Sequence, residues 1–430
     1  IADITENNPL DSNIFVFSTG EYIDSLSVGG ILKNAEDLAP MEDALVMLYT
    51  DTLDSVPLKE KPRYFTRTDK AGKWQLNYLK PGSYKLFALK DANADYLFNA
   101  PEEAIAFQPD PISPDGSDSI ELRLFQEDVE KQYIKKVTAP FYGQILFVFN
   151  RPVEDARIVP IQKDSAQWYM SELFTNKDTL VMWLTADRQL DTLSFLVSDN
   201  DSLLDTATVI IPEKGKKTKA GKNRRGEQGR FKVKPNIYQK KVNTFDPLKL
   251  QFSHPLKSWD MSGLVFTEGK DTVEFVTSFA DSLHRRMRIN YNCDEGKQYR
   301  LFIPPGAFTD IYGLQNDSID LNFSTRTEDE FGSLLLKIQG PDSMAAYIIQ
   351  LLSDKGKVVR EDKITGSTVL QYDHLNPGAY KIKLIFDRNG NGQWDTGNYL
   401  KQQQPERVIY YSGKLGIRGN WEQETEWTIE

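Results

Sequence analysis

The segment most suggestive of chemistry is rich in Asp and Asn and lies near the C-terminal end of the 430-residue chain. Oxygen-bearing side chains occupy alternate positions and a glycine stands sixth, which is the opening pattern of a calcium loop. Such spacing can surround one hard cation with oxygens at about 2.4 Å. The candidate ligands are Asp387, Asn389, Asn391, Gln393 through its main-chain carbonyl, and Asp395. The twelfth position is Asn398 instead of the usual bidentate glutamate, which weakens the predicted site.

A second Asp/Asn segment repeats this pattern in the N-terminal quarter of the chain. Tyr96 stands where the turn glycine is expected, so the prediction of calcium is weaker here. The alternative for both segments is a hairpin of Asx turns, in which Asp and Asn side chains bond their own backbone without metal. Any calcium would have a structural role, because metal that ties down a loop stabilises the folded state. The candidate ligands of this second loop are Asp91, Asn93, Asp95, Asn99 and Glu102.

Residues that commonly carry catalysis are sparse and dispersed. His254, His284 and His374 are the only histidines and fall in separate regions, and Cys293 is the only cysteine. Neither Gly-x-Ser-x-Gly nor His-Glu-x-x-His occurs, so no activated nucleophile or zinc site is indicated. The sequence therefore predicts a protein that is not an enzyme.

Two further groups could contact partners. The first is a Lys/Arg/Gly-rich stretch that could bind lipopolysaccharide phosphate, anionic headgroups or an acidic protein, or could be only a solubilising linker. The second is a set of C-terminal aromatics that could stack on sugars or form an interface, or could belong to a core. The net charge of −10 argues against a general nucleic-acid binder. The residues concerned are Lys214, Lys216, Lys217, Lys219, Lys222, Arg224, Arg225, Trp394 and Trp421.

Strands must position all of these groups. Short runs rich in Val, Ile, Tyr, Phe and Thr recur between Gly, Pro, Asn and Asp clusters, and helical periodicity is almost absent. Residues 44–49 and 83–89 are typical, and in the second run Tyr84, Leu86 and Ala88 should share one face. No run approaches the roughly 20 apolar residues of a spanning helix. The fold class predicted is all-β.

Internal repeats divide the chain. Residues around Trp74, Pro81-Gly82 and Tyr84 return 296 residues later with Pro-Gly again forming the turn, and Phe17-Ser18-Thr19 returns 306 residues later. The predicted units are 1–20, the last strand of an Ig-like domain whose body lies upstream; 21–127, a β-sandwich; 128–212, a degenerate Ig-like sandwich; 213–230, a basic linker or hairpin tip; 231–330, an Ig-like sandwich; and 331–430, a second copy of the 21–127 sandwich.

The residues also carry a resemblance to known families. The Asp69-x-x-Gly-Lys-Trp74 and Pro-Gly-x-Tyr84 elements resemble the carboxypeptidase regulatory-like, prealbumin-like (transthyretin-like) sandwich. The stretch 299–313, with its Ile-Pro-Pro-Gly-Ala-Phe core, looks like the bacterial Ig-like domain of Bacteroidetes envelope proteins. The domain order is similar to that of Ig-like domain-containing outer-membrane lipoproteins of that phylum.

This resemblance implies a function. It implies a lipid anchor upstream of Ile1 and a location on the outer membrane, either surface-exposed or facing the periplasm. It also implies a structural or accessory scaffold whose domains form an arm that contacts other outer-membrane or surface proteins, such as an assembly or export machine. A glycan-binding or adhesive surface protein is the alternative, and an enzyme comes third because fold alone does not fix function.

Overall fold

The computed structural model describes residues 24–114, 116, 120–129, 131–161, 168–174, 176–185, 192–212, 231–340 and 344–429. Within these ranges the regular structure is β, apart from the one-turn helix α1 (Val56–Lys59) and the 3-10 turn η1 (Glu328–Glu330). The predicted all-β array of sandwiches is confirmed. No helix of this part is long and apolar enough to cross a membrane. The predicted strand in 1–20 and the basic segment 213–230, with Lys214 to Arg225, lie outside the described residues.

The first module is a sheet that folds over a core, in the order β3-β2-β5-β6-β7-β1-β4. Strands β1 and β7 run parallel, and the other neighbours are antiparallel. Tyr84, Leu86 and Ala88 all point into this core, which confirms the predicted alternation. The strands are β1 (Leu26–Asn34), β2 (Leu45–Tyr49), β3 (Tyr64–Arg67), β4 (Lys73–Leu79), β5 (Lys85–Lys90), β6 (Ala104–Phe107) and β7 (Ile120–Gln126).

The fourth module repeats this topology in two layers, β29-β26-β33 and β28-β27-β30-β31, with β32 also paired to β30. Here β26 and β33 are the parallel pair. The core between the layers includes Leu336, Ile349 and Leu384. The strands are β26 (Gly332–Gln339), β27 (Ala346–Ser353), β28 (Val358–Thr365), β29 (Thr368–Leu375), β30 (Gly378–Asp387), β31 (Val408–Tyr410), β32 (Leu415–Ile417) and β33 (Glu422–Thr428).

Local details of the first and fourth modules correspond as well. The Tyr84 hydroxyl donates a hydrogen bond to the Lys80 carbonyl oxygen at 2.9 Å, and the Tyr380 hydroxyl donates to the Asn376 carbonyl oxygen at 2.7 Å. Each tyrosine thereby closes the turn that the Pro-Gly pair makes. The pairings of β1 with β4 and of β26 with β29 both contain a register shift near the start of the first strand.

The second and third modules are sandwiches of different topology. In the second module the sheet β10-β13-β14 packs on the sheet β11-β12-β9-β8, and the core between them includes Phe147 and Phe195. In the third module the sheet β15-β17-β22-β21 packs on the sheet β16-β25-β23-β19-β20, and the core includes Phe252 and Phe266. Strands β18 and β24 form a separate pair in the third module. The strands are β8 (Ile134–Phe141), β9 (Gln144–Phe149), β10 (Ala156–Pro160), β11 (Tyr169–Leu173), β12 (Thr179–Leu184), β13 (Thr192–Asp199), β14 (Ser202–Ile210), β15 (Val233–Pro235), β16 (Lys241–Val242), β17 (Leu248–Phe252), β18 (Leu256–Trp259), β19 (Val265–Glu268), β20 (Asp271–Thr272), β21 (Phe275–Phe279), β22 (Arg286–Tyr291), β23 (Gln298–Ile303), β24 (Phe308–Asp310) and β25 (Ile319–Thr325).

Polar and aromatic groups join the second module to the third. The Arg285 guanidinium hydrogen-bonds Glu172 and lies over the Trp183 ring, with its central carbon 4.9 Å from the ring centroid. The Tyr312 hydroxyl donates to the Gly143 carbonyl oxygen at 2.7 Å. A Cβ at Gly143 would lie 2.4 Å from that hydroxyl oxygen, so glycine is required for this approach. Both pairs hold the two sandwiches in one orientation.

The third and fourth modules meet around η1. Phe245 of the third module stacks on the His374 ring of the fourth, with centroids 4.3 Å apart. Lys241 pairs with Glu330 at 2.6 Å, and the Arg326 guanidinium lies 3.7 Å from the centroid of Phe331. These contacts bury part of the connection between the modules, so it is not a free linker.

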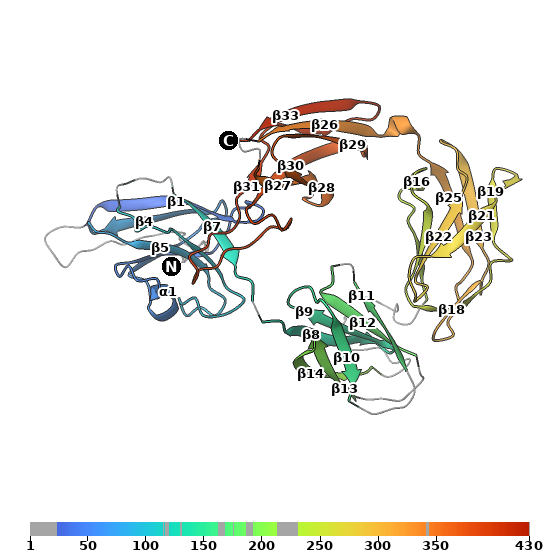
Figure 1. Cartoon of the computed structure of the whole chain (residues 1–430), viewed down its shortest axis with the longest axis horizontal. Coiled ribbons are helices and arrows are strands. Elements are labelled where there is room, and N and C mark those ends of the chain that lie inside the picture. The colour runs from blue at the N-terminus through green and yellow to red at the C-terminus, as the bar shows by residue number, and fades with distance from the viewer. Residues whose placement is uncertain are drawn as a thin grey trace, which may run out of the picture.

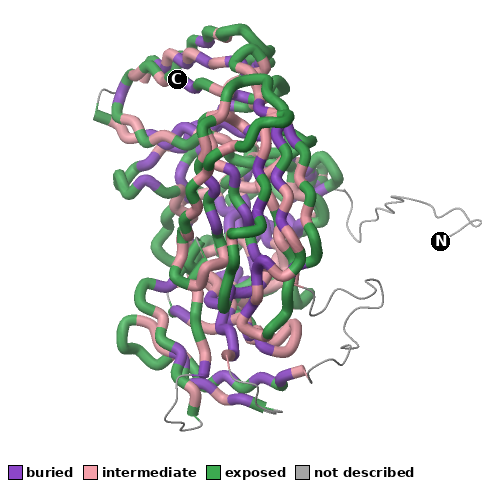
Figure 2. The backbone as a smooth tube through the Cα atoms, turned by 90° about the vertical axis from the view of Figure 1, so that its right-hand side faces the viewer, coloured by how far each residue is buried: buried purple, intermediate pink, exposed green. Residues whose placement is uncertain are grey.

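The four modules form a ring (Figure 1). The chain runs from the first module through the second and third to the fourth, which returns to contact the first. Viewed from the side, buried residues run through the inside of the modules and exposed residues cover them (Figure 2). The arm of domains expected from the resemblance is closed on itself, because the terminal sandwiches pack on each other instead of standing apart.

Candidate functional site

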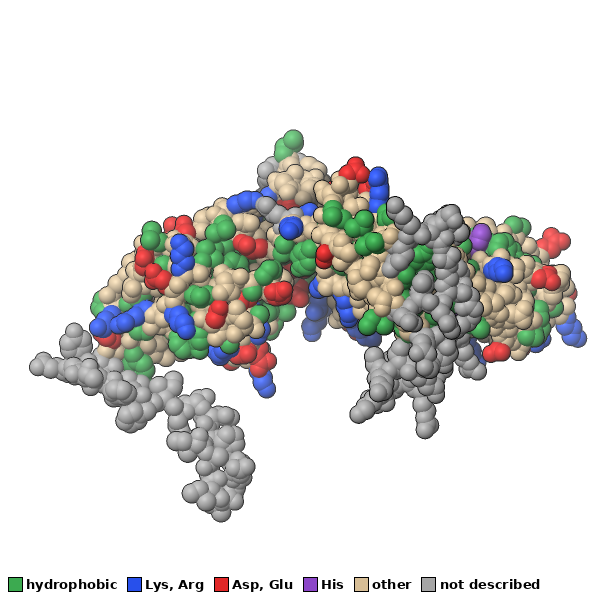
Figure 3. Space-filling view, turned by 90° about the horizontal axis from the view of Figure 1, so that it is seen from below, with side chains coloured by type: hydrophobic (Ala, Val, Ile, Leu, Met, Phe, Trp, Pro, Cys, Tyr) green, Lys and Arg blue, Asp and Glu red, His purple; other side chains and the backbone are tan. Residues whose placement is uncertain are grey.

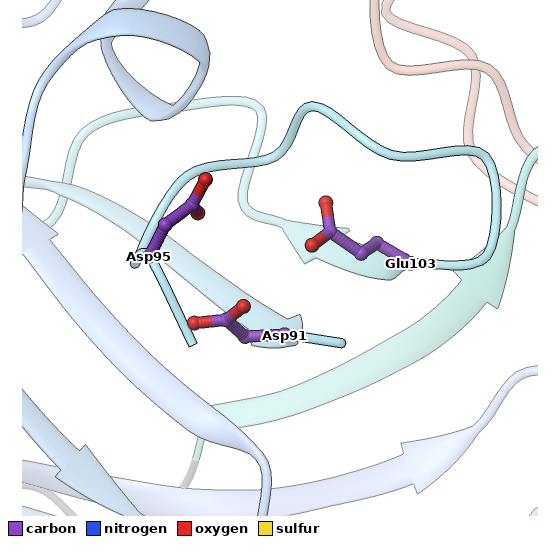
Figure 4. A group of neighbouring side chains, drawn as sticks. All are labelled: Asp91, Asp95 and Glu103. Carbon is purple, nitrogen blue, oxygen red and sulfur yellow. The ribbon is translucent and has the colours of Figure 1, made fainter. Parts of the chain in front are cut away.

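The Asp/Asn loop of the first module follows directly after β5. Asp91 accepts hydrogen bonds from the main-chain N–H groups of Ala94 at 2.7 Å and Tyr96 at 2.9 Å. One carboxylate oxygen from each of Asp91, Asp95 and Glu103 lies within 4.8 Å of the other two (Figure 4). The Asn99 side-chain amide donates to Asp95 at 2.7 Å and holds the pKa of that carboxyl below its ordinary value. Three acids thus converge on one small volume.

The acid that completes this loop is Glu103, so the prediction of Glu102 is wrong. Glu102 is exposed. Glu103 is 1% exposed and accepts hydrogen bonds from the backbone N–H groups of Asn99 and Ala100 at 2.9 and 3.0 Å. It immediately precedes β6, and its N–H donates to the Ala100 carbonyl oxygen at 3.1 Å, which closes a turn that has the exposed Glu102 in its middle.

The equivalent loop of the fourth module has the same construction. Asp387, 5% exposed, accepts from the backbone N–H of Gly392 at 2.8 Å, and Asp395 accepts from the side-chain amides of Asn389 and Asn391 at 2.6 and 2.9 Å. Gln393 is the remaining predicted ligand, and its backbone N–H donates to the Asn391 side-chain oxygen at 2.7 Å. The four predicted side-chain ligands are therefore brought together.

Glu406 was not predicted from the sequence, yet it occupies the place in the fourth module that Glu103 has in the first. It is 4% exposed and accepts from the backbone N–H groups of Arg388 at 2.7 Å and Asp395 at 3.1 Å. Burial raises the pKa of this carboxyl above its ordinary value, and the charges of Asp395 and Asp387 act in the same direction. Asn398, the twelfth residue by count, instead exchanges backbone hydrogen bonds with Gln403 at 2.8 Å.

The two loops have one backbone conformation but different residues at its strained positions. In the fourth module Gly390 and Gly392 take φ angles of +70° and +74°, which glycine adopts without cost. In the first module Ala94 and Tyr96 take +60° and +69° at the corresponding positions. The Tyr96 ring also packs edge-on against Phe65, with centroids 5.3 Å apart, which helps to hold this unfavourable conformation.

Chemically, both loops offer only oxygen ligands to a cation, and such ligands suit calcium. The same Asp and Asn side chains also satisfy backbone N–H groups, as an Asx-turn hairpin requires. Calcium at Asp387, Asn389, Asn391 and Asp395, or at Asp91, Asn93, Asp95 and Asn99, stays a prediction.

The segment that follows the fourth module's loop carries the contact that closes the ring. Tyr399 is 1% exposed and lies among aromatic rings of the first module, with its centroid 5.6 Å from Phe87, 6.3 Å from Phe98 and 5.1 Å from Phe107. Its hydroxyl donates to the Asp54 carbonyl oxygen, and burial raises the pKa of the phenol far above its ordinary value. Tyr399 is therefore a side chain of one module inside the core of another.

Polar contacts surround this anchor. The Thr396 hydroxyl donates to the Gln126 carbonyl oxygen at 2.7 Å, and the Gln404 side-chain amide donates to the Phe107 carbonyl oxygen at 2.9 Å. Gly397 sits against Phe125, where an added Cβ would lie 2.6 Å from the ring. The contact thus has an apolar centre and a hydrogen-bonded rim, as specific interfaces do.

The two predicted contact tryptophans have different surroundings. Trp394 packs against buried residues on both sides of the first-to-fourth contact, and its indole N–H donates to the Glu406 carbonyl oxygen at 3.1 Å. Trp394 therefore serves an interface within the chain. Trp421 is 62% exposed and remains available to a partner.

The histidines stay apart in the folded chain, as their sequence positions predict. His254 is buried and bonded to Asp310 at 2.7 Å, His374 contacts Glu328 at 3.0 Å, and His284 lies beside Trp259. Each belongs to a different packing environment, so the described residues do not combine them into one reactive group.

Comparison with family models gave no match, and comparison with curated proteins gave none either. Solved structures do match. The chain is similar to several tandem β-sandwich proteins. The major pilin subunit BcpA of Bacillus cereus is 11% identical, with 94% of this chain and 98% of that chain covered and a TM-score of 0.18. The S-layer protein rSbsC(31-844) is 10% identical, with 67% of this chain and 41% of that chain covered and a TM-score of 0.25. The titin fragment I67-I69 is 10% identical, with 70% of this chain and 100% of that chain covered and a TM-score of 0.16. At such scores the likeness carries nothing about function.

Proposed function

We propose that this chain is a non-enzymatic lipoprotein of the bacterial outer membrane that serves as a structural or accessory scaffold for other envelope proteins. The observation that carries the proposal is Tyr399, buried in the first module, which fixes the terminal sandwiches on each other. A scaffold needs surfaces held at constant relative positions. A closed ring supplies this better than an open chain, whose modules move independently by default.

The chemistry of the described residues supports the same proposal. Groups that could act in catalysis instead hold modules together: Arg285 and Glu172 span one joint, and His374 stacks on Phe245 in another. The face shown in Figure 3 has acidic and basic side chains interspersed, as on a protein that remains dispersed in water. These polar groups therefore stabilise the contacts between modules.

Affinity purification from native membranes in mild detergent tests the proposal. The intact chain should recover integral outer-membrane proteins in fixed proportion. Tyr399→Ala should recover fewer, because the ring opens, whereas Tyr238→Ala, at a residue 75% exposed, should leave recovery unchanged. Recovery of the bait alone by the intact chain would refute a scaffold.

Glycan binding is the second candidate, and Trp421 is the observation that favours it, since an exposed indole can stack on a sugar. Trp394 no longer supports it, because that side chain packs inside the chain. A glycan array on which binding disappears with Trp421→Ala would favour this function, and an array without signal would exclude it.

A further inference from the structure

A groove lies at the end of the β29-β26-β33 layer, beside the joint between the third and fourth modules. Its volume is about 500 Å³. Residues from η1, from the end of β29 and from the start of β33 line it, among them Glu328, Asp373, His374, Trp421 and Glu422.

The walls of the groove are held in place by the backbone. The Trp421 carbonyl oxygen accepts from the Ser333 N–H at 3.1 Å, and the Asn420 N–H donates to the Phe331 carbonyl oxygen at 2.7 Å. On the opposite side, Phe245 stacks on His374. The Trp421 side chain is therefore presented to solvent from a fixed support, which lowers the entropy that binding must overcome.

Three carboxylates line the groove: Glu328 contacts His374 at 3.0 Å, and the Arg360 guanidinium donates to the main-chain carbonyl oxygen of Asp373 at 3.3 Å. The side-chain amide of Gln371 donates to Asp373 at 2.9 Å and to Glu422 at 3.3 Å, holding the two carboxylates side by side. Among the described residues neither carboxylate lies within 4.0 Å of a basic side-chain nitrogen. Glu424 and Glu426 continue the exposed side of β33, and of these only Glu424 is paired, with Lys337.

The first module neutralises a carboxylate on the strand that corresponds to β33. The corresponding outer strand of the first module, β7, also pairs in parallel with its central neighbour. Its Glu121 is neutralised twice, by Lys33 at 2.6 Å and by Arg123, and these cations hold the pKa of Glu121 below its ordinary value. By strand register Glu121 corresponds to Glu426 of β33, which accepts a hydrogen bond from the Gln339 side-chain amide instead.

We propose that this groove binds an extended, Arg- or Lys-bearing segment of a partner protein. The inference rests on the proposed scaffold function and names the chemistry of one partner. A guanidinium stacked on Trp421 would gain a cation–π interaction and could donate to Asp373 and Glu422 in the same pose. A neutral sugar would cover the same carboxylates without supplying a compensating charge, which makes their desolvation costly.

Fluorescence anisotropy with labelled penta-arginine tests the inference on the full chain. The double variant D373N/E422Q and the variant Trp421→Ala should each weaken binding about tenfold. The control D271N/E274Q removes the same net charge from exposed positions of the third module and should leave affinity unchanged. Amide replacements on the surface keep the size of the side chains, and circular dichroism checks that each variant folds.

Equal affinities of D373N/E422Q and its control would overturn the inference, as would Trp421-dependent binding of labelled chitotriose without binding of the peptide. Failure here is distinct from failure of the scaffold. If native purification recovers partners and D373N/E422Q loses none of them, the binding of a basic segment in the groove is refuted and the scaffold function stands. If the intact chain recovers no partner, the scaffold itself is refuted.

Discussion

Replacing Tyr399 by alanine should open the ring while leaving the four sandwiches folded. The side chain is 1% exposed and touches three aromatic rings of the first module. Removing a large aromatic side chain from such a site costs about 3–5 kcal/mol. Because Tyr399 lies between modules, that loss falls on the closing equilibrium, which should shift toward the open form by two to four powers of ten.

Small-angle scattering gives the direct readout. Tyr399→Ala should increase the radius of gyration and the maximum dimension, whereas Tyr238→Ala, at an exposed tyrosine, should not. Tyr399→Phe keeps the ring and loses only the hydrogen bond to the Asp54 carbonyl oxygen, so it should cost about 1 kcal/mol and stay largely closed. Superimposable scattering curves for Tyr399→Ala and the intact chain would refute the role given to this residue.

The same phenol makes closure sensitive to alkali. Burial raises the pKa of Tyr399 above the ordinary value of about 10, so the folded state holds its proton more tightly than the open state. Its stabilisation is complete below pH 10 and is lost as the pH rises through and beyond that value. Scattering between pH 8 and 11.5 should show opening in the intact chain. Tyr399→Phe should show a shallower transition, and identical transitions would contradict this cause.

Further predictions concern glycines and the Asp/Asn loops. Gly397→Ala should open the ring, since its Cβ would meet Phe125, whereas Gly416→Ala, with nothing within 4 Å, should scatter like the intact chain; opening by both or by neither would contradict this. Ala94→Gly should raise the unfolding free energy by about 0.5 kcal/mol by relieving a positive φ, and a lower value in urea denaturation would contradict it. The melting temperature should be higher with calcium than with EDTA, and Asp95→Asn or Asp395→Asn should reduce this difference. Equal melting temperatures in both buffers would refute the predicted calcium sites.

The sandwiches could be predicted from the sequence because alternation and turn residues act locally. The run 44–49 is apolar at every position, and in the structure alternate residues serve different cores: Val46 faces the core of its own module, and Met47 faces the contact with the fourth. An uninterrupted apolar run is the mark of a strand buried on both sides. It predicts that something covers the second face, but it does not identify Tyr399, which lies about 350 residues away.

The loop acids show a second limit. Counting twelve positions from Asp91 gives Glu102, but the strand that closes the loop decides which acid points inward, and this acid is Glu103. In the fourth module the closing strand starts later, at Val408, and the acid that faces the loop is Glu406. The length of such a loop is set by where the next strand pairs, which depends on tertiary contacts that spacing rules do not contain.

The contact that closes the ring is heterologous, since the fourth module supplies a loop and the first supplies a sheet face. Heterologous contacts close when the rotation between units allows it and otherwise propagate into open assemblies. Here the second and third modules set that rotation, through joints fixed by Arg285 and Arg326. Contact within one chain is an intramolecular step, so the closed monomer should prevail over chain-to-chain assembly in dilute solution. The second and third modules therefore act as a spacer that lets the first and fourth modules pack on each other within one chain.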